Sequence, residues 1–425
     1  MSTTGTRTDL TTDPAVPSRD LLLDPDYIAE RLGRIFDRDG GIDTCSLRRV
    51  AYRPGQWIRA VYDVSSDGRP FVITGRTFAD SAEEFRRAAA DALPVDGMAA
   101  VAHDERNDTV WWTLPNDRTL KNLATLLDPP RRVRQSSGVA WHQSELVQYA
   151  PERSATARVL DAHGEVCGFA KAYRTRDALD AADLFNRVAA SVALIDGIRT
   201  PRALGWARPD RIVVLEAMRG RRWSQVPTEV QPLAMKQFGA ALAKVHGLPT
   251  DFGRGSFQRF EPEHLLNATD LIDMARTDVA DVVRRLRAKL AKDSPSRRVA
   301  VCLHGDVHWD NVLFHGDQIH MIDFDEGGSG VASADLGSML ASLMTDRLIN
   351  PQTKVAGLST AFLEGYSSTR PLPSMAELRW YTGAAFVAER AVRAITTMHL
   401  PTLTVLPELL AQADAVLAGK VSLED

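Results

Sequence analysis

A chain of 425 residues is longer than a single compact domain usually is, so two or three lobes are expected. The apolar fraction of 44% is sufficient for hydrophobic cores, and the net charge of −4 excludes a bulk attraction to nucleic acid or anionic membranes. Three scattered cysteines exclude a disulfide framework and a cysteine zinc site, which fits a reducing cytoplasm.

The residues at the N-terminus are mostly small or polar. We expect residues 1–20 to form a disordered tail, and their lack of an apolar core excludes a signal peptide. No apolar run in the sequence approaches the roughly 20 residues that a membrane span needs. A helix is predicted from Asp24 to Phe36, because Asp24 can cap it and Pro25 suits its first turn.

Two passages of short strands follow. The first predicts strands at 47–52, 57–64, 70–78 and 109–114, with helices at 81–92 (capped by Ser81) and 120–127. The second predicts strands at 154–160, 166–173, 201–206 and 211–216, with a helix at 177–195. The two can be superimposed, with Tyr52 on Tyr149, Ala60 on Ala157 and Arg76 on Lys171. This favours a duplicated unit, and two unrelated β-meanders are the alternative.

The C-terminal half predicts helices at 232–246, 267–290, 351–365, 374–398 and 403–417. Among them lie two apolar strands, 299–303 and 319–322, and each is followed by a carboxylate, Asp306 or Asp323. Asn311 stands between them. An oriented carboxylate can accept the proton of an attacking hydroxyl, and Asn with Asp is a hard-oxygen pair for Mg²⁺. The alternative is a polar loop whose acids are solvated or cap turns.

The motif His-Gly-Asp-Val-His-Trp-Asp-Asn-Val-Leu (304–313), followed by Ile-Asp-Phe-Asp (322–325), resembles the aminoglycoside phosphotransferase and choline kinase superfamily. The resemblance implies an α+β, bilobal protein-kinase-like fold, with an antiparallel-sheet N-lobe and a mainly helical C-lobe. It also implies transfer of the γ-phosphate of ATP, with Mg²⁺, to a small-molecule hydroxyl. Asp306 would be the catalytic base, and Asn311 and Asp323 the metal ligands.

The resemblance also implies an ATP site in the second passage. Lys171 would contact the phosphates, Ser154 would lie in the turn over them, and Glu216 to Met218 would form the adenine-binding hinge. Asp183, or Asp180, would hold Lys171. A surface lysine and a solvated helix face are the alternatives for Lys171 and for these acids.

The first passage has no lysine on its third strand, so we interpret it as a non-catalytic cap. The predicted organisation is a tail at 1–20, a cap resembling a degenerate N-lobe at 21–140, the N-lobe and hinge at 141–218, and the C-lobe at 219–425. The weak candidates for acceptor binding are His308, Asp310, Asp325 and Glu326, which could equally be exposed or orient the loop.

The expected function is phosphorylation of a hydroxyl on a small polar molecule: a sugar, an amino sugar or an aminoglycoside. The added N-terminal module resembles the layout of capped bacterial sugar kinases, which favours a metabolic enzyme over a resistance enzyme. The alternatives are a nucleotide-binding pseudokinase, a choline or amino-alcohol kinase, and a protein kinase. The missing glycine-rich loop argues against the last. We expect a cytoplasmic protein with no nucleic-acid or membrane partner.

Overall fold

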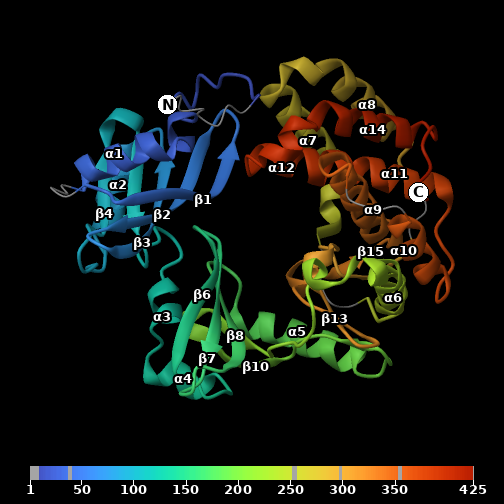
Figure 1. Ribbon diagram of the computed structural model, residues 1–425, viewed down its shortest axis with the longest axis horizontal. Helices are drawn as coiled ribbons and strands as arrows, with labels where there is room; N and C mark the ends of the chain where they lie inside the picture. Colours follow the sequence, from blue (N-terminus) through green and yellow to red (C-terminus); the bar gives the residue numbers. More distant parts are fainter. Residues whose placement is uncertain (1–8, 37–40, 251–255, 296–298, 353–356, 425) are drawn as a thin grey trace. The chain divides into compact units, whose positions relative to one another are not determined.

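The computed structural model describes residues 9–36, 41–250, 256–295, 299–352 and 357–424. The chain divides into two compact units. Unit 1 comprises Met1–Leu179, Leu204–Leu215 and Ile395–His399, and unit 2 comprises Asp180–Ala203, Glu216–Ala394 and Leu400–Asp425. Figure 1 labels most of their helices and strands.

Within the described residues, unit 1 contains two antiparallel sheets of five strands each, ordered β1-β2-β3-β5-β4 and β6-β7-β8-β11-β10. The first contains β1 (Thr44–Arg53), β2 (Trp57–Ser66), β3 (Arg69–Thr77), β4 (Val101–Asp104) and β5 (Thr109–Thr113). The second contains β6 (Gln143–Ala150), β7 (Ser154–Leu160), β8 (Val166–Tyr173), β10 (Ala203–Ala207) and β11 (Ile212–Leu215). Helices α1 (Pro25–Ile35), α2 (Ser81–Ala89), α3 (Leu123–Leu127) and α4 (Arg131–Ser136) accompany them.

The two sheets have the same topology. In each, a three-stranded meander is followed by a pair of strands that returns to its third strand. The register agrees with the superposition made from the sequence, since Arg76 pairs with Arg59 on β2 and Lys171 pairs with Thr156 on β7. Arg76 therefore occupies in the first sheet the position that Lys171 occupies in the second.

An aspartate upstream of each sheet makes the same two contacts. Asp13 accepts hydrogen bonds from the hydroxyl of Tyr52 at 2.6 Å and from the amide of Gly55 at 2.8 Å. The predicted disordered tail is therefore wrong for residues 9–20, where Val16 is also 2% exposed. Residues 1–8 lie outside the described part of the chain.

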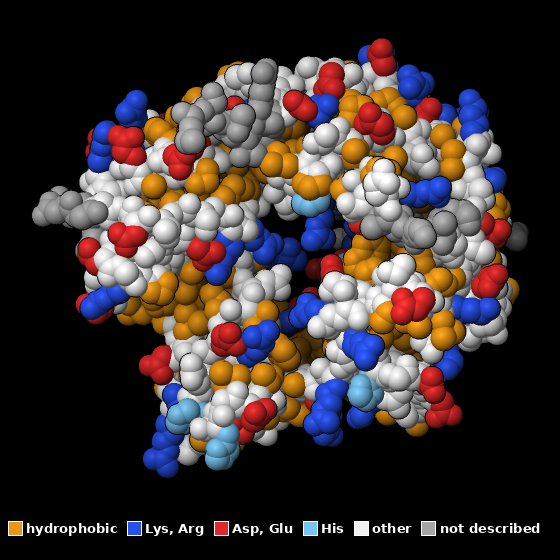
Figure 2. Space-filling model, in the orientation of Figure 1, with side chains coloured by type: hydrophobic (Ala, Val, Ile, Leu, Met, Phe, Trp, Pro, Cys, Tyr) orange, Lys and Arg blue, Asp and Glu red, His pale blue; other side chains and the backbone are white. Residues whose placement is uncertain are grey.

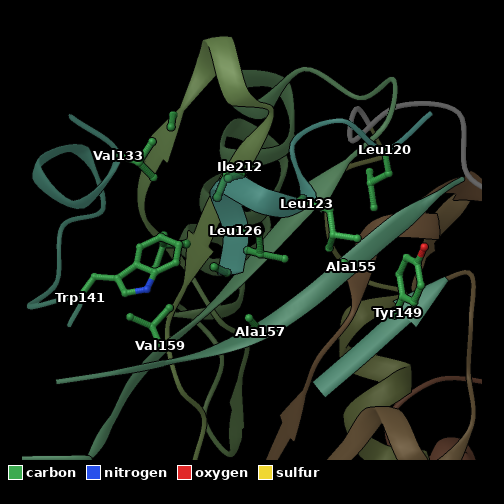
Figure 3. Close-up of a cluster of buried hydrophobic side chains, with 14 of the residues drawn as sticks. Leu120, Leu123, Leu126, Val133, Trp141, Tyr149, Ala155, Ala157, Val159 and Ile212 are labelled. Atoms are coloured by element: carbon green, nitrogen blue, oxygen red, sulfur yellow. The ribbon is translucent and has the colours of Figure 1, made fainter. Parts of the chain in front are cut away.

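Asp117 repeats this arrangement in the second sheet. It accepts from the hydroxyl of Tyr149 and from the amide of Glu152, both at 2.7 Å. The following helices α3 and α4 pack on the second sheet, in a buried cluster that includes Leu120, Leu123, Leu126, Val133, Trp141, Ala155, Ala157 and Val159 (Figure 3). A boundary at residue 140 would separate these helices from their core, so we propose that the second repeat begins near Asp117.

Local signals in the sequence predicted several elements and missed others. Strands β7 and β8 have the predicted limits, and Asp24 caps α1 through the amides of Asp26 and Tyr27. The predicted cap of α2 is wrong, because Asp80 caps that helix and Ser81 contacts His103 instead. Strand β4, helix α4 and most of β6 were missed.

Unit 2 is mainly helical. Its helices are α5 (Ala178–Val192), which begins at the end of unit 1, α6 (Gln231–Val245), α7 (Pro262–Ala275), α8 (Ala280–Lys292), α9 (Ala332–Ile349), α10 (Leu358–Ser367), α11 (Met375–Ala385), α12 (Val392–Thr396), α13 (Leu400–Thr404) and α14 (Leu406–Leu417). Its short strands are β9 (Ile198–Arg199), β12 (Val301–Leu303), β13 (Val312–His315), β14 (Gln318–Met321) and β15 (Gly328–Gly330). A π-helical turn, Phe386–Ala391, lies between α11 and α12.

Close helix packing supports the part of unit 2 that carries the predicted motif. A Cβ atom on Gly239 would lie 2.0 Å from the carbonyl oxygen of Phe362, so the backbones of α6 and α10 are in direct contact. Helix α9 is buried along most of its length and packs against α11. These helices form a rigid support for the loops that follow β12 and β14.

The predicted α+β class is confirmed, with antiparallel sheets in unit 1 and a mainly helical unit 2. In the described part of the chain, no helix has the length and apolar character that a bilayer crossing requires. Over the face shown in Figure 2, Lys and Arg side chains lie beside Asp and Glu side chains, as the interspersed charges of the sequence predict.

Candidate active site

His304 connects the two loops that carry the predicted trio. It follows β12 and is 1% exposed. Its Nδ1 accepts a hydrogen bond from the amide of Asp306 at 3.3 Å, and its Nε2 donates to the carbonyl of Ile322 at 3.0 Å. Burial lowers the pKa of His304, so the ring is neutral at pH 7 and can accept at one nitrogen while donating at the other.

The backbone before Asp323 is fixed on two sides. The carbonyl of Ile322 accepts from His304, and the amide of Ile322 donates to the carbonyl of Asn311 at 2.9 Å. Asp323 itself has a φ of 66° and a ψ of 56°, a left-handed conformation that a non-glycine residue adopts at a cost. These bonds bring the two predicted metal ligands to neighbouring backbone positions.

Asp306 is held by the side chains that follow it. The Nδ2 of Asn311 donates to the carbonyl and to Oδ2 of Asp306, at 3.0 and 3.3 Å, and Nε2 of His308 lies 3.5 Å from the same Oδ2. The carboxylate remains 38% exposed, so an incoming molecule can reach it. Burial alone would raise the pKa of Asp306, but the hydrogen bond from His308 and the charge of Arg259 hold it below its ordinary value.

A buried carboxylate on α9 supports the loop from beneath. Asp335 accepts from the amides of His304 and Gly305, at 2.8 and 3.1 Å, and from Nε2 of His246 at 3.2 Å. An aspartate at the start of a helix often caps it, but Asp335 lies one turn inside α9 and makes no cap hydrogen bond. It braces the loop after β12 instead.

Sequence reasoning missed Arg259. Its guanidinium donates to the carbonyl of Gly305, beside Asp306, and pairs with Glu389 at 2.6 Å on the π-helical turn. No local pattern links these residues, which lie 130 positions apart in the sequence. The contact gives the loop a nearby positive charge.

The weak acceptor candidates have different environments. His308 contacts the loop itself, since its Nδ1 accepts from the amide of Asp310 and its Nε2 faces Asp306. The side chain of Asp310 is 70% exposed, and Asp325 and Glu326 are half-buried in the turn after Asp323. An aromatic cluster adjoins this region: Trp223, which sequence reasoning missed, packs against Trp309 and Phe314, with ring centroids 6.4 and 5.9 Å apart.

The predicted phosphate-binding residues lie in unit 1. Lys171 is half-buried in the middle of the second sheet, between Thr156 on β7 and Val213 on β11. Ser154 begins β7 and pairs with Tyr173, two residues beyond Lys171 on β8. Both residues therefore lie near the same end of the β7–β8 hairpin.

The hinge candidates lie at the start of the second segment of unit 2, Glu216–Ala394. The amide of Glu216 donates to the carbonyl of Arg202 at 3.0 Å. Met218, two residues on, is half-buried. Asp183 is an exposed residue of α5 in unit 2, whereas Lys171 is in unit 1, so their predicted ion pair stays a prediction.

Residues 53–381 match the phosphotransferase enzyme family. The chain belongs to this family. The matched range includes the loops of Asp306, Asn311 and Asp323 as well as Lys171. The chain is therefore an enzyme, a small-molecule kinase, as the motif predicted.

The phosphotransferase also resembles solved structures. Amicoumacin kinase hAmiN, determined with AMP-PNP and Ca²⁺, is 18% identical over 72% of this chain and 97% of that chain, with a TM-score of 0.48. Macrolide 2′-phosphotransferase MphH from Brachybacterium faecium is 15% identical over 71% and 99%, with a TM-score of 0.43. Aminoglycoside phosphotransferase APH(3″)-Id from Streptomyces rimosus is 18% identical over 65% and 98%, with a TM-score of 0.42. A comparison with curated proteins gave no match.

Proposed function

We propose that this phosphotransferase moves the γ-phosphate of ATP, with Mg²⁺, to a hydroxyl group of a sugar, an amino sugar or an aminoglycoside. The observation that carries the proposal is the catalytic loop itself. Its carboxylate, Asp306, is solvent-accessible and ionised, and three neighbouring groups fix its position: His304, His308 and Asn311. A fixed, ionised carboxylate can orient an attacking hydroxyl and accept its proton.

The donor atoms near Asp306 suit a hard cation. Asn311 donates its side-chain N–H groups to Asp306, so its carbonyl oxygen Oδ1 is the atom that would bind a cation. Asp323 supplies a carboxylate from an adjacent strained position. Mg²⁺ is usually held by one or two protein oxygens together with substrate phosphates, which this pair matches. When bound, the ion would neutralise charge on the β- and γ-phosphates.

Within unit 1, Lys171 is the residue that suits the phosphate end of a nucleotide. A strand anchors its backbone, and a lysine ammonium is a mobile point charge that can meet phosphate oxygens. Ser154 offers a hydroxyl near the same end of the hairpin. Adenine would use the carbonyl of Glu216 and the amide of Met218, with Asp183 as the partner of Lys171.

Acidic side chains support an acceptor that carries amino groups. Asp310, Asp325 and Glu326 lie in the catalytic and metal loops. Burial and the charge of Asp310 raise the pKa of Asp346 on α9, which places a further carboxyl within electrostatic range of that loop. A cationic amino sugar or aminoglycoside would relieve this repulsion.

A screen of sugars, amino sugars, aminoglycosides and choline, with ADP release as the signal, tests the proposal. Transfer to a sugar or an aminoglycoside with ATP and Mg²⁺ would support it. Transfer only to choline or a related amino alcohol would replace the proposed acceptor class. Tight ATP binding without transfer to any acceptor would favour a pseudokinase.

Replacing Asp323 with Asn should weaken the metal site. The carboxylate charge is lost, so the Mg²⁺ concentration for half-maximal activity should rise about tenfold or more, and a chelator should abolish transfer by the wild type. Titration of activity with Mg²⁺, and of Mn²⁺ binding by electron paramagnetic resonance, measure this. Asp317→Asn, which removes an exposed charge from the turn between β13 and β14, is the matched control. Equal metal titrations for the Asp323 variant and the wild type would exclude Asp323 as a ligand.

Replacing Lys171 with Met should lower kcat/KM for ATP by roughly 10- to 100-fold, as expected when a hydrogen bond to a charged group is lost. Initial rates at varied ATP concentration measure it. Lys121→Met, which removes a half-exposed lysine paired with Asp91, should leave the rates unchanged. If both variants behaved alike, Lys171 would be an ordinary surface lysine.

A further inference from the structure

The turn between β6 and β7 contains a residue that its backbone disfavours. The amide of Arg153 donates to the carbonyl of Ala150 at 3.0 Å, Pro151 is the second residue, and Glu152 is the third, with a φ of 62°. This is the pattern of a type II turn, whose third position favours glycine. A glutamate there needs a compensating interaction.

The first repeat has the same turn with the favoured residue. Gln56 donates to the carbonyl of Arg53 at 3.0 Å, Pro54 is the second residue, and Gly55 has a φ of 72°. The backbone therefore does not require a glutamate at this position of the turn. The side chain of Glu152 must explain its presence.

That side chain is buried among three arginines that come from residues 59–118. Oε2 of Glu152 contacts Nη1 of Arg59 at 2.5 Å and Nη1 of Arg76, and Oε1 accepts from Nε of Arg118 at 2.7 Å. The side chain of Glu152 is 7% exposed, and those of the arginines are between 13% and 21% exposed. We call these four residues the Glu152 clamp. Glu152 is the carboxylate that all three guanidinium groups share, and Arg118 also pairs with Glu84 at 2.7 Å.

The backbone of the turn is held as well. The amide of Glu152 donates to Asp117, and the hydroxyl of Thr119 contacts the carbonyl of Glu152 at 3.4 Å. The amides of Glu152 and Arg153 are thus both used within the protein. A phosphate at this turn would have to bind side chains such as Ser154 rather than these two amides. Phosphate binding would therefore depend on where the turn holds those side chains.

One clamp residue, Arg76, is the counterpart in the first repeat of Lys171 in the second. Arg76 occupies on β3 the position that Lys171 occupies on β8, and its guanidinium binds Glu152 and stacks over Trp57 and Phe78 at 4.6 and 4.8 Å. Burial, with the like charges of Arg118 and Arg59, lowers the pKa of Arg76 despite Glu152. Arg76, the cation of the first repeat that corresponds to Lys171, is therefore already bound to Glu152 in the β6–β7 turn of the second repeat.

We propose that Glu152 is a positioning residue for nucleotide binding: through it, the first repeat holds the β6–β7 turn in the orientation that binds ATP. The inference rests on the proposed function, because it assumes that this turn faces the phosphates. The first repeat is then a fixed support for the nucleotide site rather than a second site. Removing the clamp would leave the catalytic loop intact and release the turn.

Two substitutions separate the clamp from the backbone. Glu152→Gln keeps the shape and removes the charge, and Glu152→Gly restores the residue that the first repeat uses and removes the side chain. If the released turn spends about a tenth of its time in the binding orientation, the Kd for AMP-PNP with Mg²⁺ should rise about tenfold. The value of kcat at saturating ATP should change by less than about twofold, because the fraction of time that the turn spends in the binding orientation affects ATP binding and not the chemical step.

Glu145→Gln is the matched control on the same hairpin. Glu145 lies on β6 and pairs with Arg158 on β7 at 2.9 Å, with both side chains largely exposed, and such pairs contribute little. It should leave the Kd for AMP-PNP unchanged. Arg59→Gln removes one arginine of the first repeat from Glu152 and should raise the Kd by a smaller factor, which decides the matter if the Glu152 variants do not fold.

Calorimetric titration with AMP-PNP and hydrogen exchange of the Glu152 and Arg153 amides are the measurements. A raised Kd with faster exchange in the Glu152 variants, and wild-type behaviour of Glu145→Gln, is the expected result. A wild-type Kd in folded Glu152 variants, or in Arg59→Gln if those do not fold, would overturn this inference alone. A wild-type protein that binds no AMP-PNP would overturn the proposed function and this inference with it.

Discussion

Replacing Asp306 with Asn should lower kcat by about 100-fold or more, the contribution usual for a positioned proton acceptor. The asparagine keeps the shape of the side chain and its contact with Asn311, so the loop should stay folded and AMP-PNP should bind as in the wild type. Initial rates at saturating ATP and acceptor, with calorimetric titration of AMP-PNP, measure both parts.

The control for charge is Asp317→Asn, in the exposed turn of the neighbouring hairpin, which should leave kcat unchanged. Equal rates for Asp306→Asn and the wild type would refute the role of proton acceptor. A rate loss that comes with loss of AMP-PNP binding would instead mean that the substitution damages the nucleotide site.

The pH dependence gives a second measure of the same role. The pKa of Asp306 lies below its ordinary value of 3.8, because the His308 hydrogen bond and the Arg259 charge outweigh the effect of burial. A carboxyl with a lowered pKa loses its charge only when the pH falls through that lower value. The rate ratio between the wild type and Asp306→Asn should therefore be constant from about pH 5 to pH 8, since the base stays ionised. A ratio that falls toward one near pH 5 would show that Asp306 is protonated there.

Replacing Asp335 with Asn should give the largest loss of stability. The carboxylate is fully buried and accepts from two backbone amides and from His246. Asparagine lacks the charge and keeps one of the two acceptor oxygens, so a buried donor is left without its partner, at a cost of about 1–3 kcal/mol. Thermal unfolding, with exchange of the His304 and Gly305 amides to report on unit 2, measures this.

Asp346→Asn on the same helix is the control, because the pKa of Asp346 is shifted in the opposite direction from that of Asp335. Burial alone would raise the pKa of Asp335, but the contacts with His246 and the loop amides lower it, so its charged form stabilises the fold above its unfolded pKa. Burial raises the pKa of Asp346, so its charged form is disfavoured and Asp346→Asn should cost nothing. Equal losses for the two variants would mean that the brace contributes no more than an ordinary helix carboxylate.

Residues close together in the sequence could be assigned before the structure was known. Asp306, Asn311 and Asp323 fall within 18 positions, and the two aspartates follow short apolar strands, so the local pattern predicted neighbouring loops. The alternation of β7 and β8 predicted these strands to the residue. Helix α4 was missed because a run of arginines is typical of a solvated linker. Val133 is the buried residue of this helix, so it has no apolar stripe. Strand β6 was missed because it is polar and carries a bulge between Leu146 and Gln148.

Contacts between distant segments had no sequence signal. The Glu152 clamp joins residues 59, 76, 118 and 152, and the brace joins Asp335 to His246 and to the loop after β12. From the sequence alone a charged residue is expected to be exposed to solvent, and only its neighbours in the folded structure show whether it is paired and buried. We propose a boundary near Asp117 for a similar reason, because helices α3 and α4 pack on the second sheet and no local pattern in the sequence records that packing.

The sequence by itself determined the α+β class and the phosphotransferase family, and it supplied the residues that we propose for the catalytic and metal loops, because phosphoryl transfer needs particular side chains at short, fixed spacing. Only the tertiary structure decided how these loops and the β6–β7 turn are held: by the neutral His304 between two loops, by Asp335 beneath them, and by Arg59 and Arg76 of the first repeat, which pair with Glu152. Buried charges are compensated by partners that folding brings together from anywhere in the chain, so no local pattern records them.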